Sequence, residues 1–459
     1  MLKSNIAWMK KNVPSDLKVW KGMIQDIDWS QVAAKTKLSL QRDKDRITAE
    51  FKEFAAMDTS AKIDWLMNGD RHLGYLYKKD AIAFARREWK GLKSVGYDFV
   101  GWLKIWGGML NMVMKDPMSI MLAVFEYHWF ASYLATPAVV DRSVFGRRGK
   151  LLQADFDMWV AITHWAEDLI ANLIMADAKI GGNQKINKRI IMFDEMTMAQ
   201  MMAGFPNLLG IPYQMIPVFM VSEMDQLTLI PYIDAIESYG LPSDTCPLPT
   251  AECGCAVKDE YPMCGQGFIA SSMPCDGSVM ATSFQDRRFS KFMPSYPLCM
   301  PVRYDDEDTT EMAAADMKDC IHWVEGLTGE TWNWDTYFAT MEKMNECTRL
   351  EMEKWEINKT HYPQLVGSSF ELFRKWNYEM DGGLFPEGLK TQRKICKTMM
   401  ETYEKKLPAY VGGYEKYRAL IWSCPAHFYA NFSNWLANCW GIYALTEMEA
   451  LNMTKMLNT

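Results

Sequence analysis

The chain has 459 residues, more than one hydrophobic core usually serves, so we expect two or three domains. Its net charge of -7 argues against a nucleic-acid-binding protein, because no basic excess is present to neutralise phosphates. The N-terminal segment lacks the apolar run of a signal peptide, and we expect a cytoplasmic protein whose 11 cysteines are reduced thiols or metal ligands.

Residues 1–180 are predicted to form a helical N-terminal domain, because apolar side chains recur there at the spacing of three and four that marks one helix face. The apolar stretch 118–140 is long enough to cross a bilayer. Glu126 and His128 lie in its middle, however, and ionisable groups are costly at the centre of a lipid bilayer. We therefore predict a buried helix in this stretch and no membrane span.

After residue 188 the pattern changes to short apolar runs that alternate with helical segments. The expected elements are strands or extended segments at 189–193, 211–216, 267–272 and 296–302, with helices at 197–205, at 230–240 and from Thr310. Such alternation predicts a parallel sheet with helices on both faces. We assign residues 189–332 to this first α/β lobe.

The remainder of the chain is predicted to contain a helical connector, 333–408, and the start of a second α/β lobe, 409–459. The second lobe begins with the strand pattern "YRALIWS" at 417–423 and continues through a helix to a second strand, "GIYALTE". Only one crossover is visible before the chain stops, so we expect this lobe to be incomplete. The predicted fold class is therefore α/β, with a helical N-terminal region.

Five cysteines lie within 30 residues in the first lobe, at Cys246, Cys253, Cys255, Cys264 and Cys275. Cys275 follows the strand at 267–272, and the functional crevice of a parallel sheet lies beyond such strand ends. Cys424 occupies the equivalent place in the second lobe. Cys246 follows a predicted helix, in a loop that could reach the same crevice.

No Cys-x-x-Cys pair occurs in the sequence, which disfavours a zinc ribbon or a ferredoxin domain. Two interpretations stay open at this point. Thiolates from separate loops could hold an iron–sulfur cluster, or the cysteines could be ordinary buried residues. The other cysteines fall within strand or helix patterns and are predicted to be core residues: Cys299, Cys320, Cys347, Cys396 and Cys439.

The order of these segments from residue 189 onward resembles the 2-hydroxyacyl-CoA dehydratase and benzoyl-CoA reductase family, in its cluster-carrying subunits. The resemblance is carried by "IESYGLPSDTCPLPTAECG", "GFIASSMPCDGSVMATSF" and "YRALIWSCPAHFYANFSNWLANCWGIYALTE". Its most specific feature is a helix, a short loop and Cys246, followed about thirty residues later by a strand and Cys275.

This resemblance implies two similar lobes of parallel sheet and a 4Fe-4S or related cluster, held by three cysteines in the cleft between them. It also implies a related subunit in a hetero-oligomer and a separate ATP-hydrolysing activator, which supplies an electron at very low potential. The cluster would pass this electron to the thioester carbonyl of a bound acyl-CoA substrate. The resulting ketyl radical anion expels a 2-hydroxyl group or, in the aromatic relatives, leads to ring reduction.

Cys246 and Cys275 match the first two ligand positions of the family. The third family ligand lies in the second lobe, where Cys424 projects from the right kind of loop but matches no ligand position that we can assign. Ser271 and Ser272 precede Cys275 on the strand. They could donate hydrogen bonds to the thioester oxygen or to a cluster sulfide, or they could cap the local turn instead.

The leading hypothesis is an iron–sulfur, acyl-CoA-binding subunit of a 2-hydroxyacyl-CoA dehydratase, which is a lyase. An alternative within the same family is a subunit of a benzoyl-CoA-type reductase, which is an oxidoreductase. A hypothesis from another class is a non-catalytic partner subunit that pairs with an active one.

Overall fold

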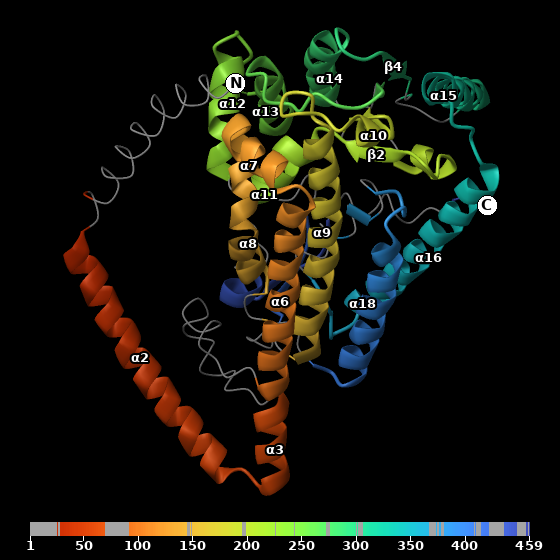
Figure 1. Ribbon diagram of the computed structural model, residues 1–459. Coiled ribbons are helices and arrows are strands. Elements are labelled where there is room, and N and C mark those ends of the chain that lie inside the picture. Colours follow the sequence, from red (N-terminus) through yellow and green to blue (C-terminus); the bar gives the residue numbers. More distant parts are fainter. Residues whose placement is uncertain are drawn as a thin grey trace.

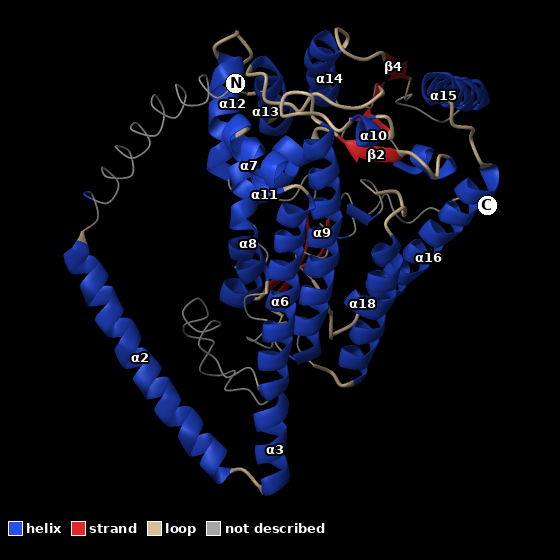
Figure 2. Ribbon diagram, viewed as in Figure 1, coloured by secondary structure: helices blue, strands red, loops and turns tan. Residues whose placement is uncertain are grey.

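The computed structural model describes residues 28–68, 91–144, 149–194, 199–224, 226–242, 244–271, 276–299, 306–366, 381–407, 415–421 and 436–447, and isolated positions beside them. Helices dominate these ranges, and the few strands lie in short segments between them (Figure 2). None of the helices described is both long and apolar enough to cross a membrane.

Long helices fill the described part of the N-terminal region. They are α2 (Trp29–Ala56), α3 (Thr59–Asn68), α6 (Leu92–Lys115), α7 (Pro117–Glu126), α8 (Thr136–Ser143) and α9 (Gly149–Ala176). Helix α2 begins after Asp28, whose carboxylate accepts hydrogen bonds from the backbone N–H groups of Ser30 and Gln31. It extends away from the rest of the molecule (Figure 1).

The apolar stretch 118–140 is not a single helix, so that part of the prediction was wrong. Helix α7 ends at Glu126, and the 3-10 helix η1 (His128–Ala135) and α8 follow it. Tyr127 separates α7 from η1 with an extended backbone, φ -118° and ψ 119°. The break turns the aromatic residues Trp129 and Phe130 into the core, where both are buried.

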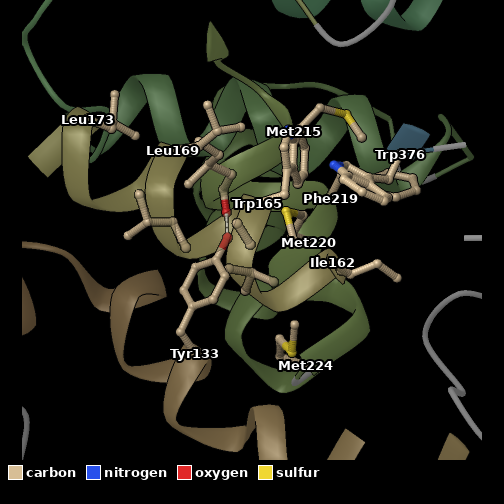
Figure 3. Close-up of a cluster of buried hydrophobic side chains, with 14 of the residues drawn as sticks. Tyr133, Ile162, Trp165, Leu169, Leu173, Met215, Phe219, Met220, Met224 and Trp376 are labelled. Carbon is tan, nitrogen blue, oxygen red and sulfur yellow. Dashed lines mark hydrogen bonds between the residues drawn. The ribbon is translucent and has the colours of Figure 1, made fainter. Parts of the chain in front are cut away.

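Helix α9 lies at the centre of the molecule, and 19 of its 28 residues are buried. It packs against α6 on one side and against α18 (Pro386–Glu404) on another. Figure 3 shows Trp165 and Leu169 of α9 in one cluster with Met215 and Phe219, which come from the passage after the second strand. One continuous core thus joins the N-terminal helices to the α/β part of the chain. The domain boundaries stay predictions.

Four short parallel strands form the first sheet. They are β1 (Ile190–Phe193), β2 (Leu209–Pro212), β3 (Gly267–Ser271) and β4 (Ser295–Leu298), in the order β2-β1-β3-β4. One face, which includes Met192 and Phe268, packs in the core that holds α9. The other face, which includes Ile191 and Ile269, packs in a second cluster. Both faces are covered, as the α/β prediction required.

The helices of this lobe cover the two faces. They are α10 (Gln184–Asn187), η2 (Ala199–Gly204), η3 (Met215–Phe219), α11 (Met220–Met224), η4 (Gln226–Leu229), α12 (Ile230–Glu237), α13 (Pro247–Val257), α14 (Asp276–Phe289) and α15 (Glu307–Thr328). Residues of α13 and α14 belong to the α9 cluster, whereas residues of η2 and α15 belong to the second one. The extended segment expected at 211–216 is only partly correct, because the chain becomes helical at Met215.

The C-terminal part contains α16 (Trp334–Asn358), α18, and the strand–helix–strand passage that the sequence predicts. Strands β5 (Tyr417–Ile421) and β6 (Ile442–Glu447) are parallel neighbours, with the π-helix η6 (Leu436–Trp440) before β6. Arg147 connects this part to α9. Its guanidinium donates to the carbonyl of Ala409 at 2.8 Å and lies 3.2 Å from the carboxylate of Asp155.

Candidate functional site

The strand order places a topological switch point between β1 and β3, since the chain passes from β1 to one side of the sheet and from β3 to the other. Ligands of open parallel sheets bind beyond the carboxyl ends of the strands at such a point. Asp194 directly follows β1, and Ser271 ends β3. The candidate site is therefore built outward from these two residues.

Asp194 and Ser271 are joined by a pair of hydrogen bonds. The backbone N–H of Ser271 donates to Oδ2 of Asp194 at 2.6 Å, and the Ser271 hydroxyl donates to the same oxygen at 2.8 Å. Both residues are almost fully buried, with 1% and 4% of their surface exposed. Asp194 thus fixes the end of β3, which is the point where the segment leading to Cys275 leaves the sheet.

The hydrogen of the Ser271 hydroxyl is engaged by Asp194, and only its lone pairs are available to other groups. Ser272, Cys275 and Cys424 lie outside the described residues, so their roles stay predictions. Asp194 was missed in the sequence analysis. The signal for it was an acidic residue directly after the wholly apolar strand "IIMF", where polar site residues of parallel sheets occur.

Cys246 lies at the N-cap of α13 and is exposed to solvent. Pro247 occupies the first turn, where proline is favourable because its missing N–H needs no partner. Cys246 lies in the loop after α12, as expected, and a helix that we did not expect begins directly after it. Helix α13 therefore fixes the position of the backbone at Cys246.

The three cysteines between Cys246 and Cys275 are core residues. Cys253, Cys255 and Cys264 are all buried. Burial raises the pKa of the Cys253 thiol to about 12 and raises the pKa values of Cys255 and Cys264 well above the usual value. Thiols of this kind stay protonated and unreactive. Of the two interpretations left open by the spacing, buried packing applies to these three.

Helices α13 and α14 pack against each other, and two pairs of residues indicate that they run in the same direction. Near their C-terminal ends, Asp259 forms an ion pair with Arg288, and halfway along them Cys253 and Ala281 share a small buried cluster. Cys253 lies six residues after the first residue of α13, and Ala281 lies five residues after the first residue of α14. Because the rise per residue is the same in both helices, their N-terminal ends lie at about the same level.

Gly254 sets how closely α13 approaches α12. A Cβ atom at this position would lie 1.9 Å from the carbonyl oxygen of Tyr232 in α12. Only glycine allows this backbone contact, which fixes α13 along its axis. The position of Cys246 at the start of the helix therefore depends on Gly254, eight residues further on.

Cys299 is exposed, so its assignment to the core was wrong. Strand β4 ends at Leu298, and the N–H of Cys299 donates to the carboxylate of Asp316 at 2.5 Å instead of continuing the sheet. The other core predictions are confirmed for the three cysteines whose side chains are described, Cys320, Cys347 and Cys396, all of which are buried. The side chain of Cys439 lies outside the described residues.

Within the described ranges, no three His, Cys, Asp or Glu side chains come together in a way that could hold a metal ion. Cys246 by itself has the properties of a ligand. It is exposed at a helix N-terminus, where the free N–H groups and the helix dipole stabilise a negatively charged sulfur. An exposed thiolate in such a position can serve as a metal ligand.

Comparison with known proteins adds the family. A search of curated proteins gives no match to the chain. The family model described as 2-hydroxyglutaryl-CoA dehydratase, D-component, matches residues 226–457, just over half of the chain. The match begins after β2 and contains Cys246, β3, β4 and the whole second sheet. The chain therefore belongs to the 2-hydroxyglutaryl-CoA dehydratase D-component family.

Proposed function

We propose that the protein is the iron–sulfur, acyl-CoA-binding subunit of an ATP-activated radical 2-hydroxyacyl-CoA dehydratase of the cytoplasm. Membership of the D-component family supports the role of a dehydratase component. The observation that supports the cluster-binding role is that α13 and α14 pack side by side and begin at about the same level. Cys246 begins one of them, and Cys275 directly precedes the other in the sequence.

In this proposal Cys246 and Cys275 hold a 4Fe-4S or related cluster, which supplies one-electron chemistry when bound. Both thiolates benefit from the N-terminal ends of α13 and α14. Asp194 acts indirectly, because it fixes Ser271 and thereby the start of the segment that carries Cys275. Cys424 is proposed as the third ligand from the second lobe.

A second candidate function is a non-catalytic partner subunit. It is favoured by the sequence, in which Cys424 matches no ligand position of the family that we can assign. The dehydratase description of the matched family favours dehydration over ring reduction of an aromatic acyl-CoA. A measurement of bound iron distinguishes the iron–sulfur dehydratase subunit from the non-catalytic partner subunit.

Proteins of a D-component family work with other subunits, and α6 has a surface suited to such contacts. Phe99, Leu103, Trp106 and Leu110 on this helix are each more than half exposed. Exposed apolar side chains grouped on one element mark interaction surfaces. We propose that this face of α6 contacts a related subunit of the dehydratase, with a separate ATP-hydrolysing activator as a further partner.

Anaerobic reconstitution with iron and sulfide tests the proposal. The wild-type protein should bind both and gain visible absorbance, and Cys246→Ala should lose most of the bound iron. The matched control is Cys253→Ala, which removes a buried thiol seven residues along the same helix and should keep the iron. Circular dichroism checks that both variants are folded. Full iron content in Cys246→Ala would contradict the proposal, and no iron in the wild type would favour the partner subunit.

A further inference from the structure

A cavity of about 770 Å³ lies at the C-terminal ends of α13 and α14, the opposite ends from Cys246. Its volume falls in the range typical of small-molecule sites. The walls come from the segment after α9, from Tyr239 after α12, and from the last turns of α13 and α14. Helix α13 has 11 residues and separates the two sites by about 16 Å.

The cations on the inner wall of this cavity have an ion-pair partner within the protein. Asp259 forms ion pairs with Arg288 and with Lys179, the latter at 3.1 Å. Asp177 lies behind Lys179 and accepts hydrogen bonds from Tyr127 and from the backbone N–H of Met263. Lys179 and Arg288 therefore share one carboxylate, that of Asp259, within the protein.

The mouth of the cavity carries a positive charge that is not balanced in this way. Arg287 and Lys291 line it and are exposed. Among the described residues no carboxylate lies within ion-pair distance of either side chain, whereas the neighbouring Arg288 has Asp259. Two cations at one edge of a cavity are a suitable partner for a phosphate group.

Aromatic rings stand beside these cations. Phe284 lines the cavity on α14, and Phe292 and Tyr239 line its rim with 68% and 73% of their surfaces exposed. Large aromatic side chains gain most when a flat ligand covers them, and a ring placed there could stack on Phe292. Apolar side chains of Val257 and Met263 complete the lining.

We propose that this cavity binds a phosphorylated planar-ring compound of the nucleotide class. The phosphate contacts Arg287 and Lys291, and the ring packs against Phe284 and Phe292. The sequence has no glycine-rich phosphate-binding loop, so side chains supply the phosphate contacts. The site is separate from the Cys246 site. Its ligand is a free nucleotide or the nucleotide end of a coenzyme, and the second source rests on the acyl-CoA-binding function proposed above.

Isothermal titration calorimetry with ADP tests the proposal on the full chain. The double variant Arg287→Ala/Lys291→Ala should weaken ADP binding about tenfold or more, because hydrogen bonds to charged groups are the stronger ones. Phe292→Ala should weaken it about fivefold through the lost ring contact. Arg349→Ala on α16, which removes an exposed arginine far along the chain, is the matched control and should bind like the wild type.

Coenzyme A and inorganic phosphate are the further probes. Tighter binding of coenzyme A than of ADP, weakened by the same variants, would support the site and identify a coenzyme as the source of the ligand. Inorganic phosphate alone should bind more weakly than ADP, since it lacks the ring. The proposal is overturned if neither ADP nor coenzyme A binds the wild type. It is also overturned if the variants bind both compounds as tightly as the wild type does. Iron content remains the separate measure of the Cys246 site, so either proposal can fail without the other.

Discussion

The two parallel sheets of this protein are built alike but are covered differently. All five residues of β3 in the first sheet are buried, whereas none of the five residues of β5 in the second sheet is buried. Tyr417 and Leu420 of β5 are 66% and 53% exposed. A parallel strand is buried only when helices reach both of its faces, and the first sheet alone has them among the described residues.

The second sheet is instead held along its edges by a few polar contacts. The guanidinium of Arg418 in β5 donates to the carbonyl of Lys359 at 2.9 Å, just after α16. The side-chain amide of Asn358 donates to the carbonyl of Leu445 in β6 at 3.4 Å. Its small core joins Tyr443 to Val366 and Ala409. The two sheets should therefore contribute very unequally to the free energy of unfolding.

The largest expected effect is a truncation in the first sheet. Phe268→Ala in β3 should lower the free energy of unfolding by about 3–5 kcal/mol, because Phe268 is fully buried and contacts Tyr213 and Phe289. Leu420→Ala in β5 should cost less than about 1 kcal/mol, since the side chain is already half exposed. Urea denaturation of both variants measures the difference. Equal losses would contradict this comparison, because they would show that both sheets contribute equally to the free energy of unfolding.

A smaller effect is expected from the helices that cover the first sheet. Gly254→Ala should cost about 1–3 kcal/mol, because the new methyl group would meet the backbone of Tyr232, which cannot move aside like a side chain. Gly326→Ala in α15 is the control, since a Cβ there meets no atom within 4 Å. It should stabilise the protein by about 0.5–1 kcal/mol through higher helix propensity. Thermal unfolding of the two variants distinguishes these signs.

The smallest expected effect concerns a buried acid in α9. Burial raises the pKa of Glu167 to about 8, and its Oε1 atom has no hydrogen-bond partner among the described residues. Between pH 4.5 and about 8 the folded protein therefore keeps this proton, whereas the unfolded chain has released it. The contribution of Glu167 to the free energy of unfolding falls as the pH rises through this range.

Glu167→Gln should remove that decline. The variant should be more stable than the wild type at pH 8 by about 1–2 kcal/mol after allowance for partial solvent screening, with the difference vanishing towards pH 4. Glu311→Gln is the matched control, because it makes the same substitution at an exposed position. Denaturation curves across this pH range provide the measurement. A wild type whose stability relative to the variant does not change with pH would contradict the raised pKa.

The sequence by itself determined the fold class and the parallel strands of both sheets. The runs "IIMF" and "GFIAS" are short, apolar and separated by helical patterns, and this combination permits little other than buried parallel strands. It also determined the family, because the order of strands, helices and cysteines survives in the linear chain.

Other features were decided only by the tertiary structure. Helix α13 was missed because it is buried by α12, α14 and η3 on several sides, so its apolar residues show no single face. The bond between Asp194 and Ser271 joins residues 77 positions apart, and only the pairing of β1 with β3 brings them together. The exposure of Cys299 depends on where β4 ends. Asp316 of α15 sets this end, because its carboxylate accepts a hydrogen bond from the backbone N–H of Cys299. Local patterns predict elements, whereas contacts between distant segments decide which side chains form the site.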